Sequence, residues 1–154
     1  MVKAKPAVPE PGLPEVQSIQ ELLDGLELTE VRTYLLHGER ANSVADDEAR
    51  IAVAVEHEGV LLEVRCKMTA STGDAELSVD RSAVFTLGHR QAIPASVMGE
   101  FVEKVGVMTV YPYLRESLFS LASSLGIAPP VVGLLRAGSV RLTAASDGSA
   151  SADR

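Results

Sequence analysis

The spacing of the apolar side chains changes at Pro94, and this change constrains the fold more than any other feature of the sequence. Before Pro94, apolar residues alternate with polar ones over several short stretches, as they do in strands with one buried face. After it, apolar residues recur at intervals of three and four, as they do in amphipathic helices. The sheet therefore precedes the helices, and the sequence predicts an α+β fold.

Four strands are predicted before the change of period. The clearest covers residues 60–69, where apolar and polar side chains alternate without a break. The others cover 26–40, 51–58 and 77–87, and the first and last need a bulge, the latter near Arg81, because their apolar parity shifts. The connections between consecutive strands are short, so a four-stranded antiparallel meander is the expected topology.

A long helix broken near its middle is predicted after the sheet. Gly106 is expected to interrupt it, and Thr109 is expected to cap its second part, with Pro112 in the first turn, where a missing N–H costs little. Gly126, followed by Pro129 and Pro130, is expected to end it.

The ends of the chain differ in composition from its middle. Residues 1–17 hold many prolines and residues 144–154 are mostly small or polar, so both are predicted to be disordered tails around one domain at 18–143. Ser18, with Glu21 three positions later, predicts a capping-box start for a short first helix.

Charge and cysteine content narrow the class of protein. The net charge of −7 opposes binding to a phosphate backbone, so nucleic acid is not an expected partner. No apolar stretch is long enough to cross a membrane, and prolines stand where a signal peptide would need an apolar core. The single cysteine, Cys66, cannot form an internal disulfide. We therefore expect a cytoplasmic protein.

The sequence shows no constellation of catalytic or metal-ligating residues. The histidines His37, His57 and His89 are far apart in sequence and have no acidic or cysteine partner at a ligand spacing. No glycine-rich phosphate loop and no nucleophile elbow are present, and Cys66 falls on a buried parity where a thiol is unreactive. The acidic run 46–48 lacks the calcium-loop pattern. A non-enzyme without cofactor or metal is expected.

An apolar seam runs along the second part of the helix and is of the kind that packs one helix on another. Packing on the chain's own sheet is the commoner use of such a stripe. Val110 and Phe119 add apolar surface off the seam, which favours self-association. The predicted oligomer interface comprises Tyr111, Leu114, Arg115, Leu118, Leu121 and Leu125.

Several short motifs resemble those of the SecB protein-export chaperones. The run Val110-Tyr111-Pro112-Tyr113-Leu114-Arg115-Glu116 is similar to the family's apolar-aromatic-Pro-Tyr-x-Arg-Glu motif. Residues 69–71, Thr-Ala-Ser, and residues 83–87 resemble the ends of two family strands. The resemblance covers about residues 26–128 and implies a SecB-like fold.

The resemblance implies an ATP-independent holdase that binds non-native polypeptides for protein export. It implies a homotetramer built as a dimer of dimers, with the translocase motor as a further partner. Two alternatives stay open. One is a SecB-like chaperone dedicated to a single client such as an antitoxin, and the other is a non-chaperone oligomeric binding protein on the same fold.

The resemblance also suggests which residues meet these partners. The expected client-binding residues lie on the first part of the helix and are Val97, Met98, Phe101 and Val102. The expected translocase-docking residues lie on the fourth strand and are Glu76, Ser78 and Asp80. After Gly126 the chain departs from the family pattern, because Pro129-Pro130-Val131-Val132-Gly133-Leu134-Leu135 stands where a further helix would follow.

Overall fold

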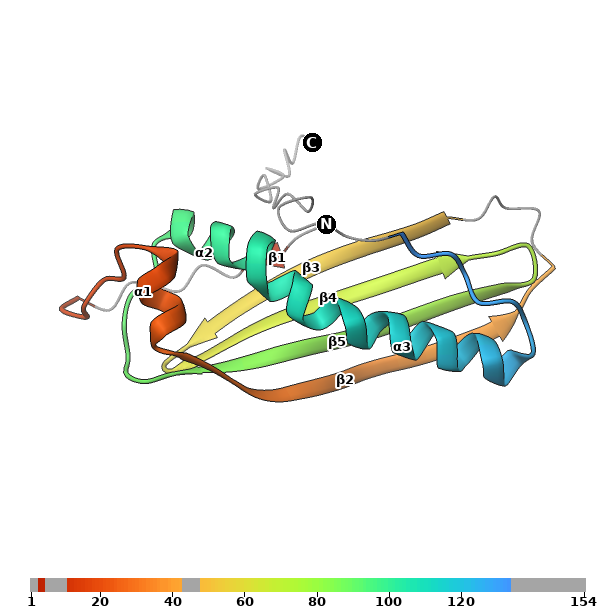
Figure 1. Cartoon of the computed structure of the whole chain (residues 1–154), viewed down its shortest axis with the longest axis horizontal. Coiled ribbons are helices and arrows are strands. Elements are labelled where there is room, and N and C mark those ends of the chain that lie inside the picture. The colour runs from red at the N-terminus through yellow and green to blue at the C-terminus, as the bar shows by residue number, and fades with distance from the viewer. Residues whose placement is uncertain (1–2, 5–10, 43–47, 134–154) are drawn as a thin grey trace, which may run out of the picture.

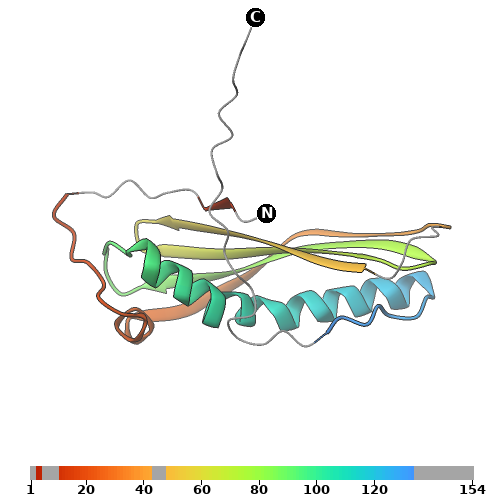
Figure 2. The same cartoon turned by 90° about the horizontal axis from the view of Figure 1, so that it is seen from above.

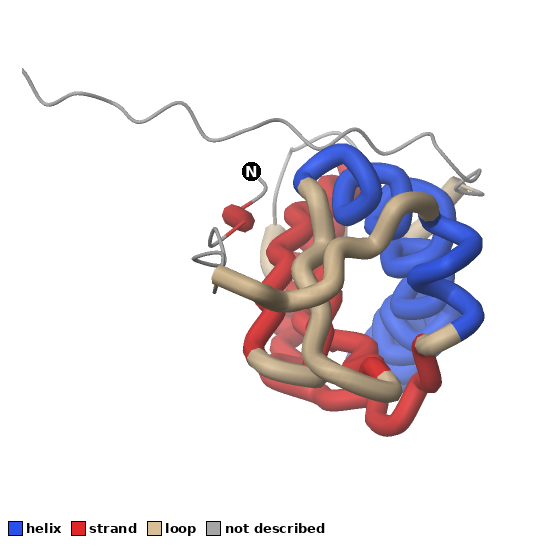
Figure 3. Tube along the Cα trace, turned by 90° about the vertical axis from the view of Figure 1, so that its left-hand side faces the viewer, coloured by secondary structure: helices blue, strands red, loops and turns tan. Residues whose placement is uncertain are grey.

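The computed structural model describes residues 3–4, 11–42 and 48–133, which form one sheet with a long helix across one of its faces (Figures 1 and 2). Seen end on, strands and helices make two layers (Figure 3). The elements are β1 (Lys3–Ala4), α1 (Ile19–Asp24), β2 (Leu26–Arg40), β3 (Glu48–Glu58), β4 (Leu61–Ser71), β5 (Ala75–Leu87), α2 (Ala95–Phe101), the π-helical turn η1 (Val102–Gly106) and α3 (Val107–Leu125). The predicted α+β class is confirmed.

The order of the strands corrects the predicted meander. The sheet has the order β1-β3-β4-β5-β2, with β1 parallel to β3 and the other pairs antiparallel. Only β3, β4 and β5 follow one another as a meander. The first long strand, β2, pairs with β5 from Leu26 opposite Leu87 to Arg40 opposite Ala75. This is the order of a Greek key, and it leaves β2 as an edge strand.

The bulge predicted in the first long strand is confirmed, and the bulge predicted near Arg81 is wrong. Register shifts in the β2–β5 pair lie between Leu28 and Glu30 and between Thr33 and Leu35, so the extra residues belong to β2. The β4–β5 register is unbroken. Leu77, Val79, Ala83, Phe85 and Leu87 keep one parity and face the core, and Arg81 interrupts them because its guanidinium donates to the Ser117 hydroxyl of α3.

The core lies between the sheet and the helices. The alternation predicted for 60–69 is confirmed, because Leu62, Val64, Cys66 and Met68 of β4 are buried toward α3. At the other end of the layer, Phe101 meets Phe85 edge to face, with ring centroids 5.3 Å apart. The long helix α3 is thereby packed against β5, β2 and β4.

The helix bends through η1 and does not stop at Gly106. Gly106 has right-handed helical geometry and continues directly into α3. Thr109 is not a cap, since its hydroxyl donates to the carbonyl of Val105 at 2.9 Å, one turn back within the helix. Pro112 consequently lies in the interior of a long helix, and the break expected at Gly106 is a π-helical turn.

The predicted end of the helix is confirmed. Gly126 has φ 64° and ψ 37°, a left-handed conformation that favours glycine. Its N–H donates to the Ser123 carbonyl, and the N–H of Ile127 donates to the Ala122 carbonyl. This pair of bonds is a Schellman motif, which ends α3 and turns the chain back toward the sheet.

Part of the predicted N-terminal tail is ordered against the domain. Val16 is fully buried, its N–H donates to the Ala92 carbonyl at 2.9 Å, and Ala92 N–H donates to the Pro14 carbonyl. Ser18 caps α1 as predicted, because its hydroxyl accepts from Glu21 N–H. Residues 14–16 and the strand β1, which pairs with β3, thus both contact the rest of the described chain. The predictions for Asp46 and Asp47, for 134–143 and for the tail 144–154 lie outside the described residues.

Candidate functional site

The apolar seam of α3 packs on the chain's own sheet. Tyr111, Leu114 and Leu118 are buried in the core of the single chain, so these three are unavailable as oligomer contacts and that part of the prediction is corrected. Leu121 and Leu125 are partly buried, and both approach Gly38 of β2. Arg115 is half-buried, with its guanidinium 6.0 Å from the centre of the Tyr111 ring.

The four predicted client-binding residues belong mostly to the core. Val97, Phe101 and Val102 are buried beneath α2 and η1, because the helix turns its apolar stripe toward the sheet. Met98 alone of the four retains partial exposure. A helical stripe predicts which face is apolar, but its partner is decided by the packing of the whole chain.

The three predicted docking residues share the sheet face that α3 leaves open. Glu76 is exposed and Ser78 is half-buried. Asp80 is buried and accepts two hydrogen bonds from the Arg65 guanidinium, from Nε at 2.9 Å and Nη2 at 2.8 Å. Asp80 is therefore already satisfied within the chain and does not present a free charge for docking.

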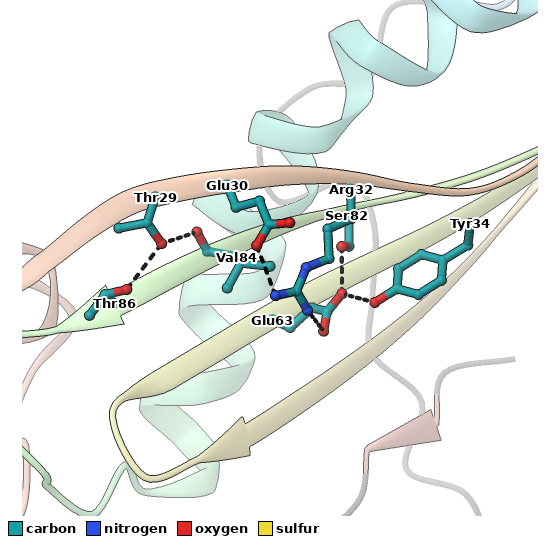
Figure 4. Close-up of polar contacts among 8 residues, drawn as sticks. All are labelled: Thr29, Glu30, Arg32, Tyr34, Glu63, Ser82, Val84 and Thr86. Atoms are coloured by element: carbon teal, nitrogen blue, oxygen red, sulfur yellow. Dashed lines mark hydrogen bonds and ion pairs between the residues drawn. The ribbon is translucent and has the colours of Figure 1, made fainter.

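A polar network occupies the same open face and centres on Glu63 (Figure 4). One carboxylate oxygen accepts from the Tyr34 hydroxyl at 2.6 Å and the Ser82 hydroxyl at 2.5 Å, while the other lies 3.4 Å from Arg32 Nη1. Tyr34 occupies a bulge of β2, and its ring lies over the Arg65 guanidinium, 3.8 Å from centroid to Cζ. The network joins three strands, and the Arg32 guanidinium also pairs with Glu30 at 2.8 Å.

An apolar margin, defined here as Leu28, Leu36 and Tyr113, runs along the edge strand on the helix side. Leu28 and Leu36 of β2 share the face of core residues Phe85 and Val79, yet are 42% and 52% exposed. Tyr113 of α3 belongs to the same side. Its ring lies under the guanidinium of Arg81, and Arg81 of β5 pairs with Thr33 of β2. The local sequence pattern does not predict this margin, because the margin exists only where β2 is the edge strand of the sheet.

An apolar groove lies between α3 and the strands β3 and β4. It holds a cavity of about 200 Å³ that is mostly apolar and includes one charged residue; its lining is Ala49, Arg50, Ile51, Met68, Tyr111, Val132 and Gly133. The Tyr111 hydroxyl donates to the carbonyl of Gly133. Burial raises the pKa of Tyr111, which keeps this hydroxyl protonated and able to donate.

The described residues offer little for catalysis or metal binding. Burial raises the pKa of the Cys66 thiol to about 12, so it is not a nucleophile at neutral pH. No cluster of three potential ligands is found in the described part of the chain. Nor is any helix there long and apolar enough to cross a membrane.

Comparisons by sequence and by structure both find SecB-like chaperones. No family model matches the chain. It is 43% identical over 136 residues to the SecB-like chaperone SmegB of Mycolicibacterium smegmatis, covering 88% of this chain and 93% of that protein. A SecB-like chaperone of Mycobacterium tuberculosis, solved in complex with a ChAD peptide from the HigA1 antitoxin, superposes with a TM-score of 0.65. At 16% identity, covering 77% of this chain and 96% of that one, this likeness shows the fold alone.

Proposed function

The chain belongs to the SecB-like chaperone family, and we propose that it is an ATP-independent chaperone that binds non-native segments of other polypeptides. The observation that carries this proposal is the sequence similarity to a SecB-like chaperone over nearly the whole of both chains. We place the activity in the cytoplasm, as the lone cysteine suggests. As a general chaperone, the protein would keep the precursors of exported proteins unfolded until they are exported.

Exposed apolar side chains support this function. The apolar margin and the apolar groove flank α3 on its two sides, and both present side chains that water solvates poorly. Burying about 500 Å² of a client's apolar surface contributes on the order of 12 kcal/mol before entropy losses. After those losses, the remaining affinity suits reversible and sequence-tolerant capture.

We also propose self-association, with the interface at the β2 edge. The outer backbone groups of this 15-residue strand have no neighbouring strand in the sheet of the described chain. An edge of this length readily pairs with another strand through its outer backbone groups. Leu121 and Leu125 of the predicted interface lie beside Gly38 of the same strand. We therefore propose a dimer through β2 and a tetramer built from two such dimers.

Partnership with a translocase motor would use the open face of the sheet. Of the residues predicted for docking, Glu76 offers an exposed charge, whereas Asp80 is held by Arg65. Docking on this face would therefore depend on Glu76 and on the exposed charges of its neighbours.

A chaperone dedicated to one client is the second candidate. It is supported by the fold likeness to a chaperone solved with an antitoxin peptide. The two candidates differ in their selectivity. A general holdase binds many unfolded chains with similar affinity, whereas a dedicated chaperone binds one client segment much more tightly than the others.

The deciding experiment is suppression of aggregation without ATP. We expect the purified protein to keep an unrelated, chemically denatured protein in solution, as measured by light scattering after dilution. The double variant Leu28→Ser/Leu36→Ser is expected to lose part of this activity, because it removes two groups of the apolar margin. Leu61→Ser, at a similarly exposed leucine elsewhere, serves as the matched control.

Unchanged aggregation of the denatured protein at several-fold excess of wild type would reject the general chaperone. Tight binding of one peptide class in the same preparation would then favour the dedicated chaperone, and no polypeptide binding at all would favour a non-chaperone binding protein.

A further inference from the structure

The two sides of the sheet are built differently. The sheet ends in β2 on one side and in β3, with the short strand β1, on the other. The pairing of β2 with β5 is interrupted by two bulges, whereas β3 pairs with β4 without a break from Glu48 opposite Ser71 to Glu58 opposite Leu61. Bulges twist an edge and restrict which strands can pair with it. β3 lacks this protection along all of its 11 residues.

The middle of β3 is the kind of segment that forms unwanted strand pairs. Residues 51–55, called here the uncharged run, read Ile-Ala-Val-Ala-Val and contain neither a charge nor a proline. High β-propensity without charge or proline is typical of segments that pair with strands of other chains. The nearest charges on β3 are those of Arg50 and Glu56, which flank the run. An open edge at this position would therefore be prone to self-association.

The short strand β1 lies on the outer side of the uncharged run (Figure 1). Lys3 pairs with Ala54 and Ala4 pairs with Val55, in parallel orientation. β1 is the outermost strand of the sheet on this side. The outer backbone groups at the C-terminal end of the uncharged run are thus engaged within the chain itself.

The sequence around β1 suits a strand that closes an edge without offering a new one. β1 is only two residues long. Pro6 follows it closely, and the nitrogen of a proline has no hydrogen to donate to a further strand. Very short edge strands and prolines are devices by which natural proteins end a sheet. β1 therefore ends the sheet where another strand could otherwise continue it.

The strand that an open β3 edge fits best is β3 of another copy. Two such strands can pair antiparallel around a two-fold axis, and an axis at Val53 sets the two uncharged runs opposite each other. The same axis places Arg50 of each copy opposite the partner's Glu56, so the flanking charges attract at both ends of the run. Such a pair needs the outer backbone groups at positions 54 and 55, which β1 occupies.

We propose that the β3 edge is a second self-association surface, that it fits β3 of another copy, and that β1 keeps it closed. Two open edges on each copy, β2 and β3, would let sheets add to one another without limit, whereas one open edge gives a closed pair. Closure by β1 therefore keeps the assembly finite. This closure concerns assembly, and it does not depend on whether the protein is a chaperone.

Removal of β1 from the otherwise intact chain tests the closure. At micromolar concentration, a variant lacking residues 2–5 is expected to form particles with a mass at least about 2-fold that of wild type, as measured by light scattering. The variant Lys3→Pro/Ala4→Pro keeps the chain length and removes both backbone N–H groups of β1, so it should behave in the same way. Thermal unfolding of each variant shows whether the fold is retained.

A charge in the uncharged run provides a matched rescue. Ala54→Glu places a carboxylate opposite Arg65 of β4, a cross-strand position that favours a negative charge. In the protein lacking residues 2–5, Ala54→Glu is expected to restore the wild-type mass, because a charge on an edge opposes strand addition. Leu61→Glu adds the same charge at an exposed site on β4, outside the uncharged run, and should not restore it.

Amide hydrogen exchange tests the pairing of β1 separately from assembly. In the Ala54→Glu background, the mass is expected to be that of wild type with or without residues 2–5. Removal of these residues should nevertheless speed exchange within positions 54–56 by at least about 3-fold, because an outer N–H group loses its partner. Exchange within β4 should stay the same.

Each outcome decides for or against the closure. Equal masses for wild type and both β1 variants would overturn it. A large mass that Ala54→Glu leaves unchanged would also overturn it, because the contact would then lie elsewhere, and so would unchanged exchange at positions 54–56. If the deletion unfolds the chain, the proline variant and the exchange measurement decide. Failure of wild type to suppress aggregation of a denatured protein would reject the chaperone function and leave this proposal standing.

Discussion

Gly106 lies so close to Val64 that a Cβ atom on the glycine would be 2.8 Å from Val64 Cγ2. The glycine occupies η1 and the valine occupies β4, so this contact sets how closely the long helix approaches the sheet. The glycine that was expected to break the helix instead permits its closest packing.

Gly106→Ala should therefore destabilise the fold by about 1–3 kcal/mol, because the added methyl overpacks the helix–sheet contact. The free energy of unfolding in urea measures this. In a Val64→Ala background, where space is created opposite the methyl, the same substitution should cost markedly less. An equal cost in both backgrounds would place the strain elsewhere.

Two arginine–carboxylate pairs of similar geometry differ in burial and should therefore differ in how much they stabilise the fold. Asp80, with 9% of its side chain exposed, accepts two bonds from Arg65, and Glu48, with 57% exposed, accepts two from Arg50. Asp80→Ala should lower the free energy of unfolding by about 1.5–3 kcal/mol. Glu48→Ala should change it by less than about 0.5 kcal/mol. Similar losses for both would contradict the structural role assigned to Asp80.

The thiol of Cys66 should be inert in the folded protein. Its pKa of about 12 leaves roughly one thiolate in ten thousand molecules at pH 8, and the side chain is fully buried. An aromatic disulfide reagent should label it only as fast as the protein unfolds. Rapid labelling in urea provides the positive control, and rapid labelling without denaturant would mean that β4 opens readily.

His57 should make the protein less stable in mild acid. Burial lowers the pKa of His57 below its ordinary 6.5, and a hydrogen bond with the Gly59 backbone offsets part of that effect. The unfolded chain therefore takes up a proton at a higher pH than the native chain does. This contribution to stability is complete above pH 6.5 and is lost as the pH falls toward the lowered native pKa.

Replacement of this histidine tests the assignment. Between pH 7 and pH 5, the free energy of unfolding of His57→Gln should fall less steeply than that of wild type. His89→Gln, at an exposed position, is the matched variant. Parallel curves for wild type and His57→Gln would remove His57 as the source of the pH dependence.

The β2 edge should control the mass of the particle. Light scattering is expected to give about four times 16.3 kDa for wild type. Leu36→Lys places a charge on the apolar margin, as natural proteins do to block edge pairing, and should shift the mass toward smaller species. Leu61→Lys, at a similarly exposed leucine of β4, should leave the mass unchanged. A wild-type monomer at micromolar concentration would reject the proposed assembly.

Local patterns in the sequence predicted most of the elements correctly. The alternation around Val64, the capping of α1 by Ser18 and the end of α3 at Gly126 each depend on residues close in sequence. The place of β2 depends on residues far apart, since Leu26 pairs with Leu87. No local rule selects that partner, so the meander was the simplest expectation and was wrong.

The candidate sites were harder to predict for the same reason. Leu114 and Phe101 stand out as apolar in the sequence, but only the packed chain shows that its own sheet covers them. The sequence does not show that Asp80 is neutralised, because its ion-pair partner Arg65 comes from the neighbouring strand. Val132 lines the same cavity as Tyr111 because the chain turns back at Gly126, and this turn is not evident from the sequence around Val132.

The Greek-key order has a consequence for how each new copy matures. The strand 26–40 leaves the ribosome first but finds its neighbour only after Leu87 has followed. At about 5–20 residues per second, synthesis of the 47 residues from Arg40 to Leu87 takes roughly 2 to 9 s. During that interval, the apolar face of the nascent strand is uncovered. Every newly made copy thus passes through the state that finished copies are proposed to recognise, which makes the protein a candidate client of itself.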